Sequence, residues 1–99
     1  MKDRYRTLAE LDRVINEPGR LAVVALLSAV EEADFRYLTT ETGLTPGNLS
    51  SHLGKLEEAA YIQVEKTYRG KVPLTICRLT PAGRSAFEGY RKTMKMSLW

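Results

Sequence analysis

Hydrophobic residues recur every three or four positions through most of the first sixty residues, which is the spacing of amphipathic helices. Leu8, Leu11, Val14 and Ile15 follow this spacing, so we expect a first helix from about Leu8 to Ile15, capped by Thr7. A second helix is expected to begin at Pro18, because proline lacks the N–H that would be unpaired in a first turn. Its sequence, PGRLAVVALLSAVEEA, is apolar on most sides and predicts the central, buried helix.

The segment ADFRYLTTETGL predicts a short third helix with Leu38 facing inward. Two beginnings are open: Asp34 caps the helix, or Phe35 first lies in a very short strand. Gly43 is expected to end this helix in a left-handed turn. Thr45 and Pro46 then combine a capping hydroxyl with a proline, which predicts a fourth helix from Pro46 to about Ala60.

After residue 60 the period changes from helical to alternating, which predicts a β-hairpin. YIQVEKTY is the first strand, RGK the turn and VPLTICRL the returning strand, in which Pro73 requires an edge position or a bulge near the tip. In the first strand Ile62 and Val64 face one way, and Gln63 and Glu65 the other. Thr80 and Pro81 repeat the threonine–proline pair and open a last helix, PAGRSAFEGYRKTMKMSLW.

This order of elements predicts a mainly α fold with a small β-hairpin, in the α+β class. A short helix, a glycine turn, a second helix and a basic-tipped hairpin form the layout of a winged helix-turn-helix. With 99 residues, we expect one domain over 1–99: a three-helix core plus a wing, with N- and C-terminal helices for dimerisation. The helix-turn-helix is expected at about 35–60, the wing hairpin at about 61–79 and the C-terminal dimerisation helix at about 81–96.

The fourth predicted helix has one narrow apolar stripe and an outward side of small residues. Leu49, Leu53 and Leu56 form the stripe. Small outward side chains allow the helix backbone to enter a major groove, where Asn48 and Ser51 can hydrogen-bond base edges. The N-terminal half is favoured for entry, because the helix dipole attracts phosphate there and two glutamates follow at the other end. The alternative is a surface helix without a partner. His52 either packs at the edge of the core or donates to a phosphate.

Charge supports a nucleic-acid partner for the second part of the chain. Residues 1–60 hold seven Lys/Arg and ten Asp/Glu, a balance of −3, whereas residues 61–99 hold eight and two, a balance of +6. Arg69 and Lys71 flank Gly70 at the expected hairpin tip, where they can reach a minor groove or the phosphate chain. The alternative is a solvated turn whose charges prevent strand pairing with other molecules.

The two terminal helices each present an apolar stripe, and a small domain cannot easily bury both. A two-fold dimer would cover them, and it would place two recognition helices about 34 Å apart on DNA. The alternative is that both stripes pack on their own domain. The expected dimer interface consists of Leu8, Leu11, Ile15, Phe87, Tyr90, Met94 and Leu98.

Several function classes find no support in the sequence. The longest apolar run, LAVVALL, is too short for a membrane span, and the N-terminus lacks an apolar signal core, so we expect a cytoplasmic protein. No nucleophile–base spacing and no glycine-rich phosphate loop occurs, so catalysis is not expected. Cys77 is the only cysteine and His52 the only histidine, which leaves no ligand set for a metal, and no cofactor is expected.

The segment LTPGNLSSHLGKLEEAAYIQVEKTYRGKVPLTICRLTPAGRSAF resembles the winged-helix transcriptional regulators of bacteria and archaea, relatives of the MarR and ArsR types. EPGRLAVVALL and DFRYLTTETGL extend the resemblance, which covers about residues 10–90. The resemblance implies a homodimeric repressor or activator of transcription that binds duplex DNA. It places Gly47, Asn48, Ser50, Ser51 and Lys55 in the recognition helix, and Arg69 and Lys71 in the wing. The chain departs from the family at Ala60, where glycine usually follows the recognition helix, and it lacks the paired cysteines of ArsR-type metal sensors.

The function expected from these observations is sequence-specific binding of double-stranded DNA by a homodimeric transcriptional regulator on a near-palindromic operator. The alternative is a winged-helix protein-interaction module without direct DNA binding. The expected DNA-binding residues are Thr45, Gly47, Asn48, Ser50, Ser51, Lys55, Arg69 and Lys71. The expected partners are DNA and a second copy of the chain, and no membrane.

Overall fold

The computed structural model of the chain describes residues 3–98, which form five helices and a three-stranded sheet. In chain order the elements are α1 (Arg4–Ala9), α2 (Pro18–Ser28), β1 (Ala33–Asp34), α3 (Phe35–Thr42), α4 (Pro46–Glu58), β2 (Ile62–Arg69), β3 (Val72–Leu79) and α5 (Pro81–Leu98). This is the winged-helix arrangement of the α+β class that the sequence predicts. Trp99, which the prediction included in the last helix, lies outside the described residues.

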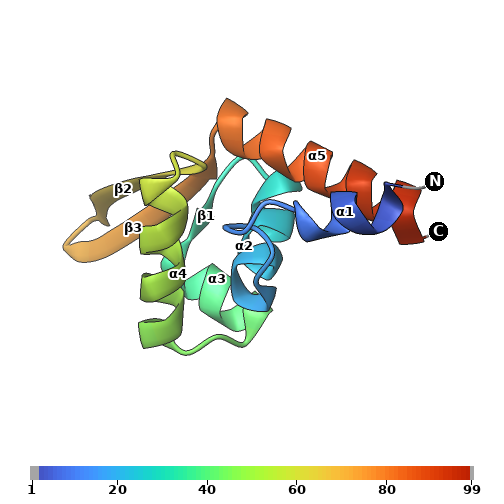
Figure 1. Ribbon diagram of the computed structural model, residues 1–99. Coiled ribbons are helices and arrows are strands. Elements are labelled where there is room, and N and C mark those ends of the chain that lie inside the picture. Colours follow the sequence, from blue (N-terminus) through green and yellow to red (C-terminus); the bar gives the residue numbers. More distant parts are fainter. Residues whose placement is uncertain (1–2, 99) are drawn as a thin grey trace.

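The molecule is elongated, with principal extents of 57 × 25 × 21 Å. The β2–β3 hairpin projects at one end beside α4, and α1 lies along the C-terminal part of α5 at the other end (Figure 1). Between them, α2, α3 and α4 enclose the core together with the base of the sheet. We refer below to the wing end and to the α1–α5 end.

The N-terminal segment differs from the prediction of a helix over Leu8–Ile15. The first helix ends at Ala9, and the following residues form turns. Asp12 explains the difference: its Oδ1 accepts the backbone N–H groups of Val14 (2.9 Å) and Ile15 (3.1 Å), and so replaces the helical pattern there. Thr7 is not a cap but lies inside α1, where its hydroxyl donates to the carbonyl of Asp3 (2.7 Å).

Two tyrosines of distant elements fix this segment on the body. The hydroxyl of Tyr61 donates to the carboxylate of Asp12, and that of Tyr90 donates to Oδ1 of Asn16 (2.9 Å). The bond to Asp12, together with burial, raises the pKa of Tyr61 to about 12. The apolar residues of the segment therefore reach the core without forming a helix, and Ile15 is fully buried.

Asp34, Thr45 and Thr80 are helix caps as predicted, whereas Thr7 is not. Asp34 accepts the N–H of Tyr37 (2.7 Å) and Thr45 that of Asn48 (3.2 Å). Thr80 likewise accepts the N–H of Gly83 (3.0 Å). Gly43 ends α3 with φ at +72°, as predicted. Pro18 begins α2 as expected, but that helix ends at Ser28, before the predicted Ala33.

The sheet has the order β1-β3-β2 and is antiparallel throughout. Of the two openings weighed for the third helix, the Asp34 cap is confirmed, whereas a strand position for Phe35 is wrong: the short strand β1 consists of Ala33 and Asp34, and Phe35 is the first residue of α3. β1 pairs only with Ile76 and Cys77 of β3, so the distal part of β3 has an open edge. Pro73 lies in that part, opposite Tyr68, which confirms its predicted edge position near the tip.

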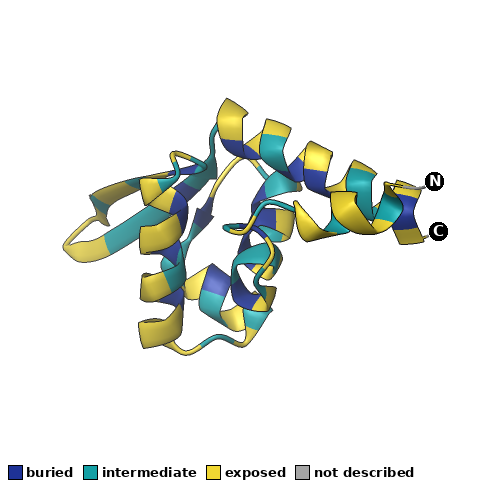
Figure 2. Ribbon diagram, in the orientation of Figure 1, coloured by how far each residue is buried: buried dark blue, intermediate teal, exposed yellow. Residues whose placement is uncertain are grey.

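The core contains the leucine stripe of α4, which is buried as predicted (Figure 2). Its other fully buried members come from α2, α3, the sheet and the N-terminal segment: Ile15, Val23, Val24, Leu27, Leu38 and Cys77. Burial raises the pKa of the Cys77 thiol to about 11, so this cysteine serves as a small apolar core residue.

Ala60 makes the turn from α4 into β2 in a left-handed conformation, with φ at +62°. It is the only residue other than glycine with positive φ among residues 3–98. The alanine therefore keeps the sharp helix-to-strand turn, at a cost of roughly 1–2 kcal/mol for the unfavourable approach of its Cβ to the carbonyl.

Candidate nucleic-acid interface

The outward side of α4 is exposed and small, as the sequence predicts. All eight residues expected to bind DNA are solvent-exposed: Thr45, Gly47, Asn48, Ser50, Ser51, Lys55, Arg69 and Lys71. Added Cβ atoms at Gly47 and Gly54 would meet no atom within 4 Å. Packing within the chain therefore does not require these two glycines, although each lowers helix stability by roughly 1 kcal/mol relative to alanine. Their small size leaves the backbone of α4 open to close approach from outside.

The N-terminal end of α4 points away from the rest of the molecule, at the lower edge of Figure 1. The hydroxyl oxygen of Thr45 accepts one N–H of the first turn, that of Asn48. The positive end of the helix dipole faces solvent. Glu57 and Glu58 lie at the opposite end of the helix, next to the turn into the sheet. The electrostatic gradient along α4 thus favours an anionic partner at its N-terminal half.

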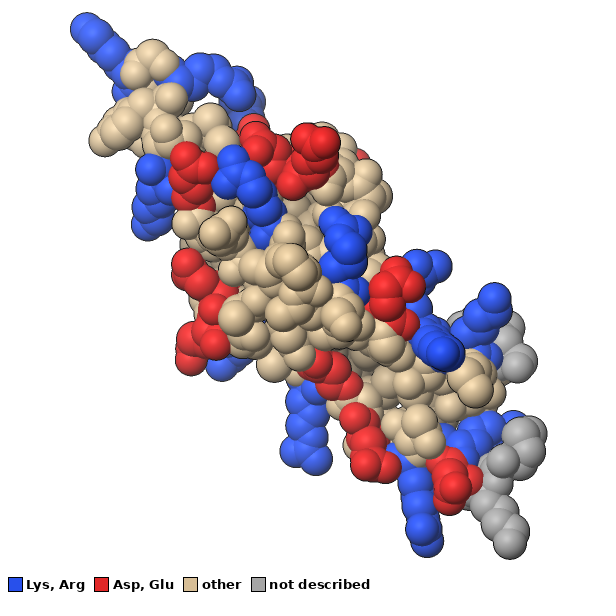
Figure 3. Space-filling model, turned by 90° about the horizontal axis from the view of Figure 1, so that it is seen from above, with Lys and Arg blue, Asp and Glu red and all other residues tan. Residues whose placement is uncertain are grey.

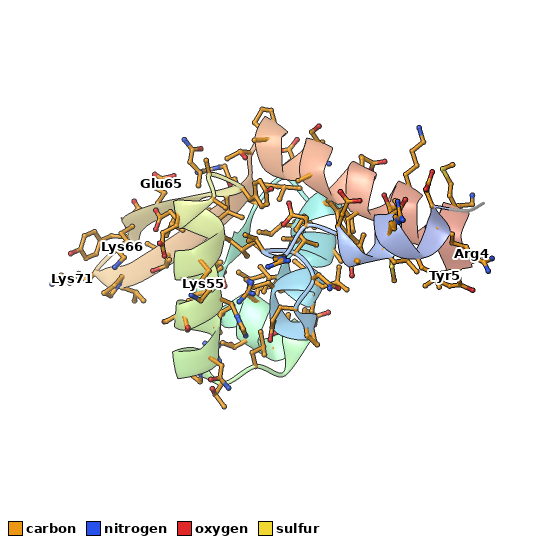
Figure 4. All side chains as sticks on the ribbon, viewed as in Figure 1. Arg4, Tyr5, Lys55, Glu65, Lys66 and Lys71 are labelled. Atoms are coloured by element: carbon orange, nitrogen blue, oxygen red, sulfur yellow. The ribbon has the colours of Figure 1, made fainter. Side chains whose placement is uncertain are left out.

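The wing adds unpaired positive charge beside α4. Gly70 turns the hairpin with φ at +63°, between Arg69 and Lys71. Lys66 and Lys71 extend from the wing and Lys55 from α4 (Figure 4). Within residues 3–98, none of these four cations lies within 4 Å of a carboxylate.

Arg78, by contrast, is not available to a partner. Its guanidinium lies 2.8 Å from Glu32 and 2.8 Å from Glu65, and these hydrogen bonds raise its pKa. The positive charge of the wing is therefore concentrated toward the tip, and Figure 3 shows Lys and Arg at that end of the molecule, as well as at the other.

His52 packs at the edge of the core, which is one of the two interpretations of the sequence. Its Nε2 lies 3.7 Å from Oε1 of Glu17, the residue that caps α2, and its Nδ1 lies 3.4 Å from a guanidinium nitrogen of Arg20. The ring lies over Gly19, where a Cβ would overlap it. His52 thus fixes α4 to the start of α2 instead of facing the outward side.

The residues expected at a dimer interface divide into two groups. Ile15, Phe87 and Tyr90 are buried within the chain, so they do not form a free surface and this part of the expected interface is corrected. Because α1 packs along α5 of the same chain, one subunit covers the two terminal stripes in part. Leu8, Leu11 and Met94 are half-buried, and Leu98 is exposed.

Sequence reasoning missed four exposed residues at the two ends. Tyr5 and Met96 lie at the α1–α5 end, and Tyr68 and Val72 lie at the wing end. The signal for Tyr68 was misleading, because its position in the strand alternation is that of Ile62 and Val64, the inward residues. Tyr68 is exposed because β2 extends beyond α4, so no helix covers this part of the strand.

Neither a metal site nor a membrane span is found in the described part of the chain. Between residues 3 and 98, no three side chains of His, Cys, Asp or Glu come together as metal ligands would. Over the same range, every helix is too short or too polar to cross a bilayer. Three open grooves border the wing in the described residues: two, of about 570 Å³ and 270 Å³, against β1 and α3, and one of about 230 Å³ against α4.

Comparison with known proteins places this geometry in context. Residues 20–98 match the family model described as a winged helix DNA-binding domain. An uncharacterized protein of Methanocaldococcus jannaschii is 39% identical over 79 residues, which is 79% of this chain and 85% of the relative.

Solved structures share the fold. A transcriptional regulator homologue from Pyrococcus horikoshii OT3 superimposes with a TM-score of 0.84 at 24% identity, covering 97% of this chain and 93% of that one. A MarR-family transcriptional regulator from Silicibacter pomeroyi gives a TM-score of 0.70 at 20% identity, covering 97% of this chain and 64% of that one. The likeness extends over the terminal helices as well as the helix-turn-helix and wing.

Proposed function

The chain belongs to the winged helix DNA-binding domain family, and from this premise we propose that it is a transcriptional regulator that binds double-stranded DNA sequence-specifically as a homodimer. Its operator is near-palindromic, because a two-fold dimer presents two equivalent recognition helices. The observation that carries the proposal is the exposed, small-residue side of α4 beside unpaired wing cations.

The N-terminal half of α4 enters the major groove. Asn48 and Ser51 hydrogen-bond base edges, and Gly47 and Gly54 allow the backbone to approach. Lys55 contacts a backbone phosphate further along the helix. The carboxylates of Glu57 and Glu58 keep the C-terminal end of α4 out of the groove, because they repel phosphate.

The wing steadies this arrangement from the side. Arg69 and Lys71 reach the adjacent minor groove or the phosphate chain from the hairpin tip. Since no carboxylate competes for them in the described residues, their charge is available to DNA.

The dimer forms through the α1–α5 end. Leu98, Met96 and Tyr5 are exposed there, and Leu8, Leu11 and Met94 are only partly covered by the chain itself. Exposed apolar residues gathered at one end of a small protein indicate an interface. This end lies opposite the wing, so a partner there leaves both DNA-binding surfaces free (Figure 1).

The names of the two solved structures support a regulatory role, since both are described as transcriptional regulators or homologues of them. The family to which this chain belongs is one of DNA-binding domains, not of catalytic ones.

The decisive experiment selects bound sequences from a random duplex library with the purified full chain, followed by titrations of the selected duplex at several salt concentrations. We expect an enriched inverted repeat and an affinity that falls as salt rises. The double variant Arg69→Ala/Lys71→Ala is expected to reduce the slope of log affinity against log salt by about 3.6, since the dimer loses two phosphate contacts in each subunit and each lost contact removes about 0.9.

Lys92→Ala is the matched control, because this exposed lysine lies on α5, away from α4 and the wing. It should leave the slope unchanged. Absence of enrichment, together with an affinity insensitive to salt, would instead favour the protein-interaction alternative.

A further inference from the structure

We propose that Tyr68 and Pro73 form an apolar wedge that inserts between base pairs in the minor groove beside α4, so that the protein prefers a flexible pyrimidine–purine step beneath each wing. This inference deepens the proposed function and rests on it. The proposed function assigns residues that contact base edges and phosphates. This inference adds Tyr68, a residue whose binding depends on how easily the DNA deforms.

Tyr68 has no role within the chain that explains an aromatic residue. Its exposed fraction is 70%, and it is not part of the core cluster or of the half-buried residues around that cluster. Its hydroxyl makes no hydrogen bond in the described part of the chain. Because the chain does not cover the ring of Tyr68, its apolar face is available to a partner.

The sheet register places Pro73 directly opposite Tyr68. Directly paired residues of an antiparallel ladder share a face, so the ring and the pyrrolidine form one apolar tip. Proline is rigid, and both side chains lose little conformational freedom when they are buried against bases. This pair therefore has the shape and stiffness of the wedges that unstack base steps.

The wedge lies on the side of the sheet where the DNA must lie. Ile62, Val64 and Lys66 occupy the same face of β2 as Tyr68. Nearer the body, this face supports α4: Val64, Lys66 and Thr75 border the 230 Å³ groove, whose other wall is Ser50, Gly54 and Glu57 of α4. A duplex that lies against the outward side of α4 therefore meets the part of this face that extends past the helix.

The charges around the wedge select a polyanion. Lys66 shares its face, and Arg69 and Lys71 follow at the turn. Figure 4 shows Lys66 and Lys71 on the wing. The one carboxylate among residues 62–72 belongs to Glu65, which faces the other way and is paired with Arg78. An apolar tip surrounded by unpaired cations complements the minor groove, whose walls are phosphates and whose floor is stacked bases.

The test compares sequences selected from a random duplex library by the wild-type chain, Tyr68→Ala and Tyr68→Phe. The wild type should enrich a half-site together with a TA or CA/TG step at a fixed distance from it. Tyr68→Ala should retain the half-site but lose the step, and should bind the wild-type consensus duplex roughly a hundredfold more weakly, as expected for the loss of one base-stacking contact under each of the two wings of the dimer. Tyr68→Phe should retain both features, because the wedge needs the ring and not the hydroxyl.

Tyr37→Ala is the matched control, because this exposed tyrosine lies on α3 and not on the wing. It should select the same sequences as the wild type. A direct readout uses the consensus duplex with 2-aminopurine at the step: unstacking raises its fluorescence with the wild type and not with Tyr68→Ala.

The outcomes separate this inference from the function on which it rests. If wild type and Tyr68→Ala enrich the same half-site and the same flanking steps, the wedge is refuted and the regulator function stands. If no protein in the set enriches any sequence, the proposed function fails and the wedge fails with it.

Discussion

The wing end and the α1–α5 end of this molecule carry similar exposed side chains on different supports. Tyr68 and Val72 stand beside Arg69 and Lys71 at the wing, whereas Tyr5, Met96 and Leu98 stand among the charges of two packed helices. A two-stranded hairpin is narrow and offers its apolar residues one pair at a time. Two helices side by side offer a broad surface. The same residue types therefore suit the DNA groove proposed at one end and the second subunit proposed at the other.

The comparison also explains the placement of small residues. At the wing end, Gly47 and Gly54 have open space around the position of a Cβ, so packing within the chain does not require their small size, whereas the proposed DNA partner does. In the first turn of α5, Gly83 has no such space, because it touches the turn from α4 into β2. A glycine on a helix therefore indicates approach from outside in one case and packing within the chain in the other. The structure distinguishes the two.

The largest expected effect tests the wing end. Ser51→Glu places a carboxylate on the outward side of α4, where it would face the phosphates of the groove, and should weaken DNA binding by about a hundredfold, or close to 3 kcal/mol. Fluorescence anisotropy with the selected duplex measures this.

Ser85→Glu is the control for that change, since it adds the same charge to an exposed serine of α5. It should alter affinity little. Equal losses in the two variants would contradict a specific role for the outward side of α4.

The next effect tests α5, the helix that begins beside the α4–β2 turn and ends at the α1–α5 end. A Cβ at Gly83 would overlap the carbonyl oxygen of Tyr61 and lie 2.9 Å from Cδ1 of Leu79, so Gly83→Ala should destabilise the fold by about 2–3 kcal/mol. Gly89, one and a half turns along α5, has open space, and Gly89→Ala should stabilise by roughly 1 kcal/mol through helix propensity. Urea unfolding followed by circular dichroism measures both. Similar effects of the two substitutions would show that α5 does not rest on the α4–β2 turn.

The third effect tests the α1–α5 end. Met96→Glu should raise the dimer dissociation constant at least tenfold, or about 1.4 kcal/mol, because it puts a charge into the interface. Val72→Glu adds the same charge to an exposed apolar residue of the wing and should leave the dimer intact. Sedimentation equilibrium measures both. Dissociation by Val72→Glu alone would move the interface to the wing end.

The smallest effect concerns the turn that joins α4 to the wing. Ala60→Gly should stabilise the protein by about 0.5–1 kcal/mol and raise its Tm by a few degrees, because glycine adopts the left-handed conformation without Cβ crowding. Ala25→Gly, at an exposed position inside α2, should destabilise by roughly 1 kcal/mol. Thermal unfolding should show opposite signs for the two alanine-to-glycine changes. A destabilising Ala60→Gly would mean that Ala60 is not strained.

The sequence by itself determined the order of elements from residue 18 onward, most of the helix ends and the recognition helix. These features depend on local chemistry: a threonine or aspartate that accepts an N–H three residues later, a glycine in a left-handed turn, and three leucines on one side of a helix. Contacts of this kind lie within a few residues of one another, so a linear pattern contains them.

Tertiary structure alone decided which apolar stripes are covered and which side chains remain free. Asp12 turned an apparently helical segment into a loop fixed by Tyr61, a residue 49 positions away. Glu32 and Glu65 neutralised Arg78, and packing within the chain buried three of the seven residues of the expected dimer surface, Ile15, Phe87 and Tyr90. Tyr68 has the alternation of an inward residue, and it is exposed because β2 extends beyond α4. Burial and pairing depend on which distant elements meet, and a local pattern of residues does not contain that information.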